Sequence, residues 1–162
     1  LIAAGREGCV LKELSSFYIM GKKPMWQWIK LKQKDEVDLI LTGYKDPKIE
    51  YSGKNIESWP YWKEINGILQ PVTKDYYMGW IGALELSAYV NGQLTFICYS
   101  AGLDESQKAM LKANADKYIG KVCKITFMEK TEANIPRHPR FECFHESKLP
   151  QECVWDFPNR KG

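Results

Sequence analysis

The sequence predicts a mainly β protein with a helix, in which a short β-rich segment precedes a five-stranded barrel. Residues 26–32 alternate between two kinds of side chain, as the residues of a strand do. Asn91-Gly92 joins two runs rich in aliphatic and aromatic residues, which is the strongest short signal of a hairpin. A capped helix signal over residues 104–120 then separates this hairpin from two later strands. These three patterns together indicate the barrel.

The N-terminal part is expected to form two strands with an unusual set of side chains. Residues 7–14 predict a short buried strand after a glycine turn, and residues 26–32 predict a second strand. One face of the second strand would carry Trp26, Trp28, Lys30 and Lys32. A basic surface beside two core tryptophans would give this pattern, but a groove for a flat, charged ligand fits it better.

A polar break over residues 32–36 predicts a hinge, so we expect two domains, over residues 1–34 and residues 35–162. Residues 37–44 predict a strong strand at the start of the second domain. Residues 45–78 are rich in turn-forming and aromatic residues. A loop this long inside a compact domain usually has a function or carries small elements of its own.

The rest of the second domain has the order hairpin, helix, strand, strand. Asp104 and Gln107 resemble a capping box at the start of the helix, and Gly120 marks its end. With the first strand, this order is the plan of the OB-fold, a five-stranded barrel with a helix between its third and fourth strands. The expected elements are hairpin strands over residues 80–89 and 94–100, a helix over 104–120, and strands over 121–129 and 141–144.

The composition is that of an ordinary globular protein, with 44% hydrophobic and 27% charged residues among 162 and a net charge of +3. No run approaches the roughly 18 apolar residues of a membrane span, and the start resembles no signal peptide. Because the chain opens without an initiator Met, it looks cut from something longer. Five widely spaced cysteines without a Cys-x-x-Cys pair, and only two histidines, disfavour a zinc site or a disulfide framework. We expect free thiols in a reducing cytoplasm.

Two short clusters carry the residues from which we expect chemistry. The ammonium groups of Lys30 and Lys32, two positions apart on one strand, would be about 6.5–7 Å apart, which suits oxygens of one or two adjacent phosphates. Glu7, beside a glycine on the other strand, would hold a divalent metal directly or through water. Metal and lysines together neutralise an α-phosphate during nucleotidyl transfer. Taken alone, Glu7 is more often a surface turn residue.

Together these clusters resemble motifs of one known family. Residues 7–12, Glu-Gly-Cys-Val-Leu-Lys, resemble motif IV of the covalent nucleotidyltransferases. Residues 28–32, Trp-Ile-Lys-Leu-Lys, resemble motif V in the form typical of ATP-dependent DNA ligases. The resemblance covers nearly the whole chain and points to a bacterial or bacteriophage branch. Further matching segments are residues 42–44, 50–54, 59–62, 72–74, 79–82 and, for motif VI, 137–148.

The resemblance implies the end of an adenylation (nucleotidyltransferase) domain over residues 1–34 and an OB-fold domain over residues 35–162. It implies Lys30 and Lys32 as catalytic residues and Glu7 as the ligand of Mg²⁺. The implied binding set for ATP, which becomes covalent AMP in the full-length enzyme, is Glu7, Trp28, Lys30, Lys32 and Lys148.

Two departures from the family pattern matter. Motif VI usually reads Arg-x-Asp-Lys, whereas residues 145–148 read His-Glu-Ser-Lys and keep only the lysine. This departure argues against a reaction with ATP that depends on the motif VI arginine, unless Arg137 or Arg140 takes its role. His145 would assist a phosphate only when protonated. Motif I, Lys-x-Asp-Gly, supplies the lysine that becomes adenylylated and does not occur in the sequence. We therefore expect these residues alone not to form the enzyme–AMP intermediate.

Four residues are candidates for DNA contact: Arg137 and Arg140 for phosphates, Lys54 for the backbone, and Trp59 for stacking on a base or sugar. The alternative for the two arginines and for Lys54 is that they are solvated surface residues. For Trp59, stacking on nucleic acid and packing inside the protein are about equally expected. Trp80 and Trp155 are expected to be core anchors.

The function that follows is nick sealing in duplex DNA, during replication or repair, by a monomeric enzyme that binds no membrane. The first alternative is a non-catalytic OB-fold module that binds single-stranded nucleic acid, which explains the aromatics but not Glu7 with Lys30 and Lys32. The second alternative is an RNA-capping guanylyltransferase, which shares the motif order. The Trp-x-Lys-x-Lys spelling at residues 28–32 favours a DNA ligase over it.

Overall fold

Strands dominate both of the units into which the protein divides. The computed structural model describes residues 8–15, 20, 28–32 and 34–156, and the chain separates into a unit over Leu1–Asp35 and a unit over Glu36–Gly162. The second unit also holds helices α1 (Lys74–Met78) and α2 (Glu105–Tyr118). The mainly β class expected from the sequence is confirmed. The functional identity of each domain stays a prediction.

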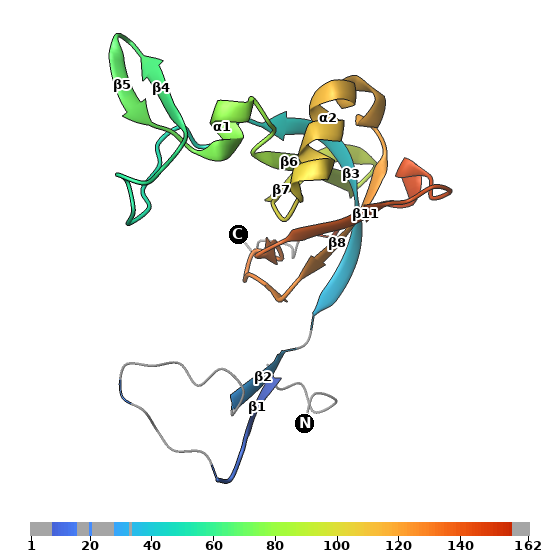
Figure 1. Ribbon diagram of the computed structural model, residues 1–162. Coiled ribbons are helices and arrows are strands. Elements are labelled where there is room, and N and C mark those ends of the chain that lie inside the picture. Colours follow the sequence, from blue (N-terminus) through green and yellow to red (C-terminus); the bar gives the residue numbers. More distant parts are fainter. Residues whose placement is uncertain (1–7, 16–19, 21–27, 33, 157–162) are drawn as a thin grey trace. The chain divides into compact units, whose positions relative to one another are not determined.

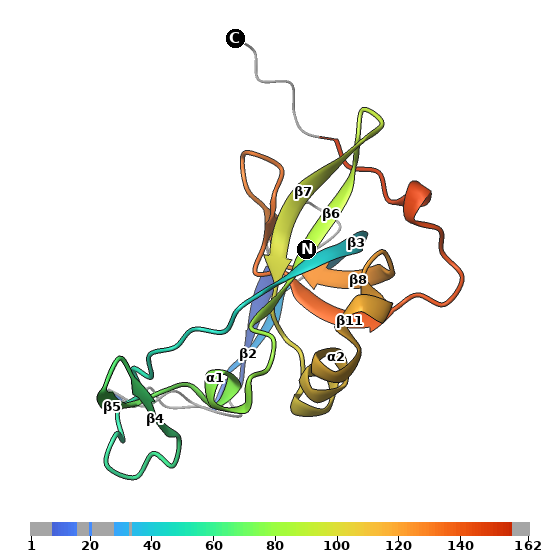
Figure 2. The same cartoon turned by 90° about the horizontal axis from the view of Figure 1, so that it is seen from above.

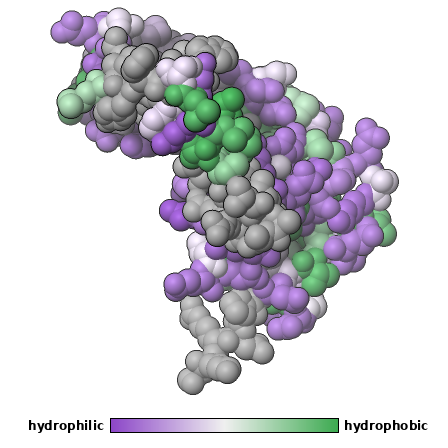
Figure 3. All heavy atoms as spheres, turned by 90° about the horizontal axis from the view of Figure 1, so that it is seen from below, coloured by the Kyte–Doolittle hydropathy of each residue, from purple (hydrophilic) through white to green (hydrophobic). Residues whose placement is uncertain are grey.

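The first unit contains a two-stranded antiparallel ribbon. Strand β1 (Gly8–Lys12) pairs with β2 (Trp28–Lys32), and the Lys12 ammonium lies 4.0 Å from the centre of the Trp28 ring. Both strands were predicted, but the burial expected for β1 was wrong, since Val10 is 47% and Leu11 53% exposed. Among the residues that the structure describes, no second layer covers this ribbon, so its apolar groups stay open. Figure 3 shows exposed hydrophobic residues as green patches on a mostly hydrophilic surface.

The second unit is built on the predicted five-stranded barrel (Figures 1 and 2). The strand order is β11-β8-β3-β6-β7. A parallel bridge between Ala101 and Arg140, with the Phe141 amide donating to the Ala101 carbonyl at 3.0 Å, joins the two outer strands and closes the barrel. This closure is the OB-fold plan. The five strands are β3 (Asp35–Lys45), β6 (Ala83–Val90), β7 (Gln93–Ser100), β8 (Val122–Phe127) and β11 (Arg140–Phe144).

Local signals set the hairpin and the helix. Asn91 and Gly92 have φ of 51° and 79°, as the tight turn between β6 and β7 requires. The Asp104 side chain accepts from the Gln107 amide at 2.7 Å, and the Gln107 side chain accepts from the Asp104 amide at 2.9 Å, so the capping box is present. Gly120, with φ of 85°, follows the helix. These expectations are confirmed, although β6 starts three residues after Trp80.

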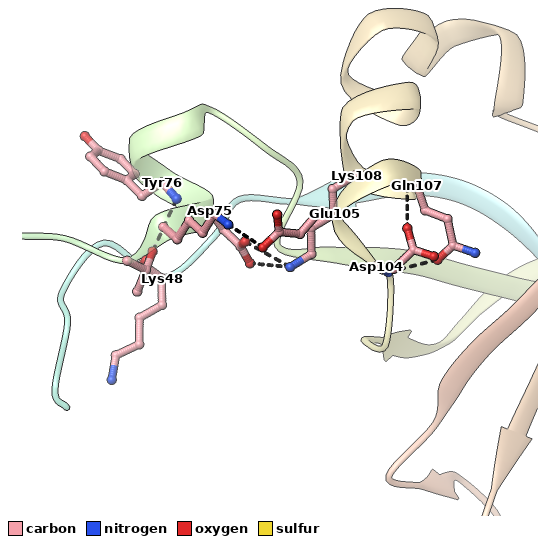
Figure 4. A network of polar contacts seen from close by, with 9 residues as sticks. Lys48, Asp75, Tyr76, Asp104, Glu105, Gln107 and Lys108 are labelled. Atoms are coloured by element: carbon pink, nitrogen blue, oxygen red, sulfur yellow. Dashed lines mark hydrogen bonds and ion pairs between the residues drawn. The ribbon is translucent and has the colours of Figure 1, made fainter. Parts of the chain in front are cut away.

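The segment between β3 and β6 carries small elements of its own, as its length predicted. Strands β4 (Trp62–Ile65) and β5 (Ile68–Pro71) form an antiparallel hairpin, and α1 follows it. The Lys108 ammonium of α2 donates to the Asp75 carboxylate at 2.8 Å, which ties α1 to α2 (Figure 4). A second ion pair, between Lys74 and Glu105, supports the same contact.

Two short elements complete the second unit. Strands β9 (Glu129–Lys130) and β10 (Pro136–Arg137) form a ribbon between β8 and β11, and a 3-10 helix over Pro150–Glu152 lies near the C-terminal end of the described chain. Trp155 is 5% exposed and belongs to the core, and Trp80 is also buried, as expected. Within the residues described, no helix has the length and apolar character needed to cross a membrane.

The barrel interior is filled by alternate residues of the strands and capped by the helix. Leu39 and Leu41 of β3, Leu84 and Leu86 of β6, and Leu111 of α2 are all completely buried. Burying one leucine side chain stabilises a fold by about 1.5–3 kcal/mol, so this set supplies much of the driving force for folding. Because Leu111 is the one buried residue within α2, it anchors the helix to the barrel.

Leu111→Ala is expected to lower the free energy of unfolding by about 2–5 kcal/mol, because it removes a fully buried side chain and leaves a cavity. Urea unfolding followed by circular dichroism measures this loss. Ala113→Ser, at an exposed position of the same helix, is the control and should cost about 0.5 kcal/mol. Equal losses in the two variants would show that α2 is not anchored through Leu111.

Candidate functional site

The β1–β2 ribbon carries the positions from which nucleotide chemistry was predicted. Its register places Gly8 opposite Lys32, Val10 opposite Lys30 and Lys12 opposite Trp28. Glu7 and the side chains of Lys30 and Lys32 lie outside the described part of the structure. The strand that carries both lysines is therefore present, while the predicted convergence of these three side chains on one phosphate stays a prediction.

Trp28, predicted to bind the cofactor, lies on the same strand as these lysines, and its side chain is described. Its ring faces the Lys12 ammonium across the ribbon, and a cation over a tryptophan face is attracted by the ring quadrupole. The family motif that includes Lys12 and the one that includes Trp28 thus meet as a cross-strand pair. This contact stiffens the far end of the strand that carries Lys30 and Lys32.

The segment predicted to correspond to motif VI is held by one carboxylate of the barrel. The Asp38 side chain on β3 contacts the His145 imidazole at 2.8 Å through one oxygen and the Lys148 ammonium at 2.5 Å through the other. The His145 amide also donates to the Val122 carbonyl at 2.8 Å. Lys148, a predicted ATP-binding residue, is therefore paired with a carboxylate in this structure, and its role toward ATP stays a prediction.

The environment of Asp38 shifts two pKa values. Partial burial raises the pKa of the Asp38 carboxyl, but hydrogen bonds from Lys148 and His145 outweigh burial and leave it below its ordinary value. The hydrogen bond to Asp38 raises the pKa of Lys148. Both groups are thus held in their charged forms. Asp38 was missed at the sequence level, although a carboxylate between apolar residues of a buried strand was a usable signal.

A surface hollow of about 560 Å³ lies beside this cluster. The Tyr118 and Phe144 rings are 4.8 Å apart in its wall, and the Lys121 ammonium lies 4.8 Å from the centre of the Tyr118 ring. Aromatic faces next to ammonium groups suit a flat anionic ligand of mononucleotide size. The residues that line it are Met110, Tyr118, Gly120, Lys121, Val122, Phe144, His145, Glu146 and Lys148.

The predicted DNA-contact residues occupy three places in the second unit. Arg137 pairs with Glu129 at 2.6 Å across the β9–β10 ribbon, and both remain well exposed. Arg140, at the start of β11, is exposed, and among the described residues none forms a hydrogen bond or ion pair with its side chain. Lys54 is exposed in the segment between β3 and β6. All three cations are open to solvent, and their DNA contacts stay predictions.

Trp59 is the centre of an aromatic cluster. Its ring stacks on Tyr51 with centroids 3.7 Å apart and meets the edge of Tyr61 at 5.2 Å. Its Nε1 donates to the Val72 carbonyl at 2.7 Å. One ring face is therefore used for internal packing, so a role in DNA stacking, which remains a prediction, would fall to the rest of the ring.

Asp38→Asn is expected to lower the free energy of unfolding by about 1–3 kcal/mol at pH 7, because it weakens two charge-assisted contacts. A lowered folded-state pKa stabilises the fold above the unfolded pKa of about 3.9, and this contribution disappears as pH falls through the folded value. Urea titrations at about pH 7 and pH 3 test this window. Glu36→Gln, on the same strand as Asp38, breaks an exposed ion pair with Lys124 of β8 and should cost much less than Asp38→Asn. A loss no larger for Asp38→Asn, or one independent of pH, would contradict the assignment.

No family model and no curated protein sequence matches this chain. Solved structures do match its fold. A structure named Pmar-Lig_Pre. aligns with a TM-score of 0.57 and 22% identity over 91% of this chain and 29% of its own. A structure described as "DNA binding with a minimal scaffold: Structure-function analysis of Lig E DNA ligases" aligns with a TM-score of 0.52 and 18% identity over 89% of this chain and 42% of its own.

This chain therefore spans less than half the length of the solved chains it matches, 29% and 42% for these two. A third match, Pmar-Lig_PreS3, gives a TM-score of 0.55 and 20% identity over 88% of this chain and 28% of its own. At these identities the likeness concerns the fold. The chain thus shares its fold with part of solved DNA ligases, the class of structure that its motifs resemble.

Proposed function

We propose that this chain is the C-terminal part of an ATP-dependent DNA ligase, which seals nicks in duplex DNA through enzyme–AMP and DNA–adenylate intermediates. The observation that carries the proposal is the order of its parts. A ribbon pairs the motif IV-like strand with the motif V-like strand, with Gly8 opposite Lys32, and an OB-fold barrel follows it. The alternative, a free-standing OB-fold that binds nucleic acid without catalysis, does not explain the two lysines of this strand.

The ribbon positions suit nucleotidyl transfer. Lys30 and Lys32 are two residues apart on β2, so their Cα atoms are separated by about 6.5–7 Å of strand rise. We assign both lysines to the α-phosphate, whose negative charge they would neutralise during in-line attack, while the electron pair of the breaking bond leaves with pyrophosphate. Trp28 would bind the nucleotide with them, and Lys148 of the second unit is a further residue assigned to ATP.

Glu7 is assigned to the metal because it directly precedes Gly8, which pairs with Lys32. A carboxylate is a preferred ligand of Mg²⁺, and one or two carboxylates with the substrate phosphates usually complete such a site. Magnesium would supply charge neutralisation on the phosphates. Among the described residues there is no group of three acidic, histidine or cysteine side chains that would hold a metal without a substrate.

The barrel unit would hold the DNA. Lys54, Arg137 and Arg140 are exposed and would contact backbone phosphates, while Trp59 would contact a base or sugar. Phosphate contacts release counterions, so such binding weakens steeply with salt. They position the protein on the duplex without reading its sequence, which is what a nick-sealing enzyme needs.

In the full-length enzyme, Lys32→Ala is expected to abolish adenylyl transfer from ATP, because it removes the ammonium group assigned to the α-phosphate, and to leave the backbone pairing of β2 intact. Transfer of labelled AMP from ATP to the protein measures this. Lys34→Ala, just beyond the strand and exposed, is the matched control and should keep activity. This chain alone, which lacks Lys-x-Asp-Gly, should take up no AMP. Ligation at the wild-type rate by Lys32→Ala would refute its role, and labelling by GTP instead of ATP would favour a capping enzyme.

The chain is expected to bind a nicked duplex more tightly than a continuous duplex of the same sequence, with an affinity that falls steeply as salt rises. Gel shifts over a salt series measure both. Lys54→Ala should reduce the log–log slope by about 0.9, the value for one phosphate contact. Lys117→Ala, an exposed lysine of α2, should leave the slope unchanged. Equal slopes in the wild type and Lys54→Ala would remove Lys54 from the DNA contact.

A further inference from the structure

Two basic side chains at the edge of the surface hollow share one carboxylate. Asp38 contacts the His145 imidazole through one oxygen at 2.8 Å and the Lys148 ammonium through the other at 2.5 Å. His145 and Lys148 both line the hollow of about 560 Å³, whereas Asp38 does not. An anion that enters the hollow and the Asp38 carboxylate would thus draw on the same ammonium group of Lys148.

The fold holds this contact in place and leaves it partly open to water. Asp38 stands on β3 directly before Leu39, which is completely buried. The His145 amide donates to the Val122 carbonyl of β8 at 2.8 Å. The Asp38 side chain is 22% and the Lys148 side chain 31% exposed. Water therefore screens the charge of the carboxylate only in part, so this charge acts on whatever binds Lys148.

The charges around the hollow are balanced while Asp38 is present. Lys121 lines the hollow, and its ammonium lies 4.8 Å from the centre of the Tyr118 ring. Glu146 lines the hollow as well and carries the opposite charge. The two ammonium groups, of Lys121 and Lys148, thus face the two carboxylates of Asp38 and Glu146. Without the charge of Asp38 the hollow would be a cationic site.

Asp38 has two opposing effects on an anion at Lys148. It orders the lysine side chain, and ordering one long side chain favours binding by about 2-fold to 13-fold. It also repels the anion, because two oxygens that contact one ammonium group are about 4–5 Å apart. One pair of unit charges at this distance changes an affinity by about 5-fold even in water. A polyphosphate carries several charges and the screening is incomplete, so repulsion exceeds the ordering effect.

We propose that Asp38 acts as an internal competitor that keeps the affinity of Lys148 for polyphosphates low. The inference rests on the proposed function, in which Lys148 meets the phosphates of ATP. The first step of that reaction transfers AMP to the protein and releases pyrophosphate. A site that held pyrophosphate tightly would slow its departure and favour the reverse transfer. With Asp38 beside it, Lys148 contacts the leaving phosphates and then returns to the carboxylate.

The test measures the binding of inorganic pyrophosphate to this chain by isothermal titration calorimetry at about 0.1 M salt. Asp38→Asn keeps the shape of the side chain and removes its charge. This variant is expected to bind pyrophosphate at least about fivefold more tightly than the wild type, although its fold is less stable. A merely structural role of Asp38 predicts the opposite sign, because loss of order at the site weakens binding.

Two further variants separate this competition from a general change of charge. Glu105→Gln removes the same charge and breaks an exposed ion pair with Lys74. It lies at the start of α2, about 20 Å of helix from Tyr118, so screening by salt should leave its affinity at the wild-type value. Lys148→Ala should bind more weakly than the wild type. In that background Asp38→Asn should gain less than about twofold, because the ammonium group that it frees is absent.

Three outcomes overturn the proposal. The first is an affinity of folded Asp38→Asn that equals or falls below that of the wild type. The second is a wild-type affinity in Lys148→Ala, which decides the matter even where Asp38→Asn fails to fold. The third is a full gain by Asp38→Asn in the absence of Lys148. Because the measurement uses neither ATP nor the ribbon lysines, its failure leaves the proposed function standing, and AMP transfer tests that function separately.

Discussion

The pairing of β3 with both β8 and β6 is the constraint on which the rest of the barrel unit depends. Because side chains alternate along a strand, this register directs Leu39 and Leu41 into the core and Asp38 outward. Asp38 then reaches the segment after β11. A register shift between Leu41 and Gly43 then brings Gly43 opposite Glu85 of β6. A slip of one residue would bury the carboxylate and expose two leucines, so fold and surface chemistry are set by the same ladder.

The sequence predicted those elements whose signals are local. The turn at Asn91-Gly92 and the capping box of Asp104 were legible because a few neighbouring residues decide each of them. Two features escaped because they depend on distant partners. Asp38 meets Lys148 across 110 residues, and the register shift that turns Tyr99 outward is a property of the β6–β7 ladder. The prediction that β1 is buried was wrong, because an apolar strand stays exposed unless another layer covers it.

The candidate nucleotide-binding residues were predicted from their spacing in the sequence. The structure shows how the two strands that carry them pair. Gly8 opposite Lys32 brings two sequence motifs to one end of one ribbon. Lys148, the candidate nucleotide-binding residue of the barrel unit, differs from the ribbon residues because its ammonium group already pairs with the Asp38 carboxylate. A phosphate that binds Lys148 would therefore compete with this carboxylate for the ammonium group.

Strand pairings place several cationic positions at one end of the barrel. Lys45 pairs with Ala83 where the long segment between β3 and β6 leaves and returns, and Leu84 beside it pairs with Ser100. Arg140, paired with Thr126 and bridged to Ala101, marks where the β9–β10 ribbon returns. Both connections therefore emerge at one end of the barrel, so the pairing of the strands alone brings the cationic positions Lys45 and Arg140 to that end.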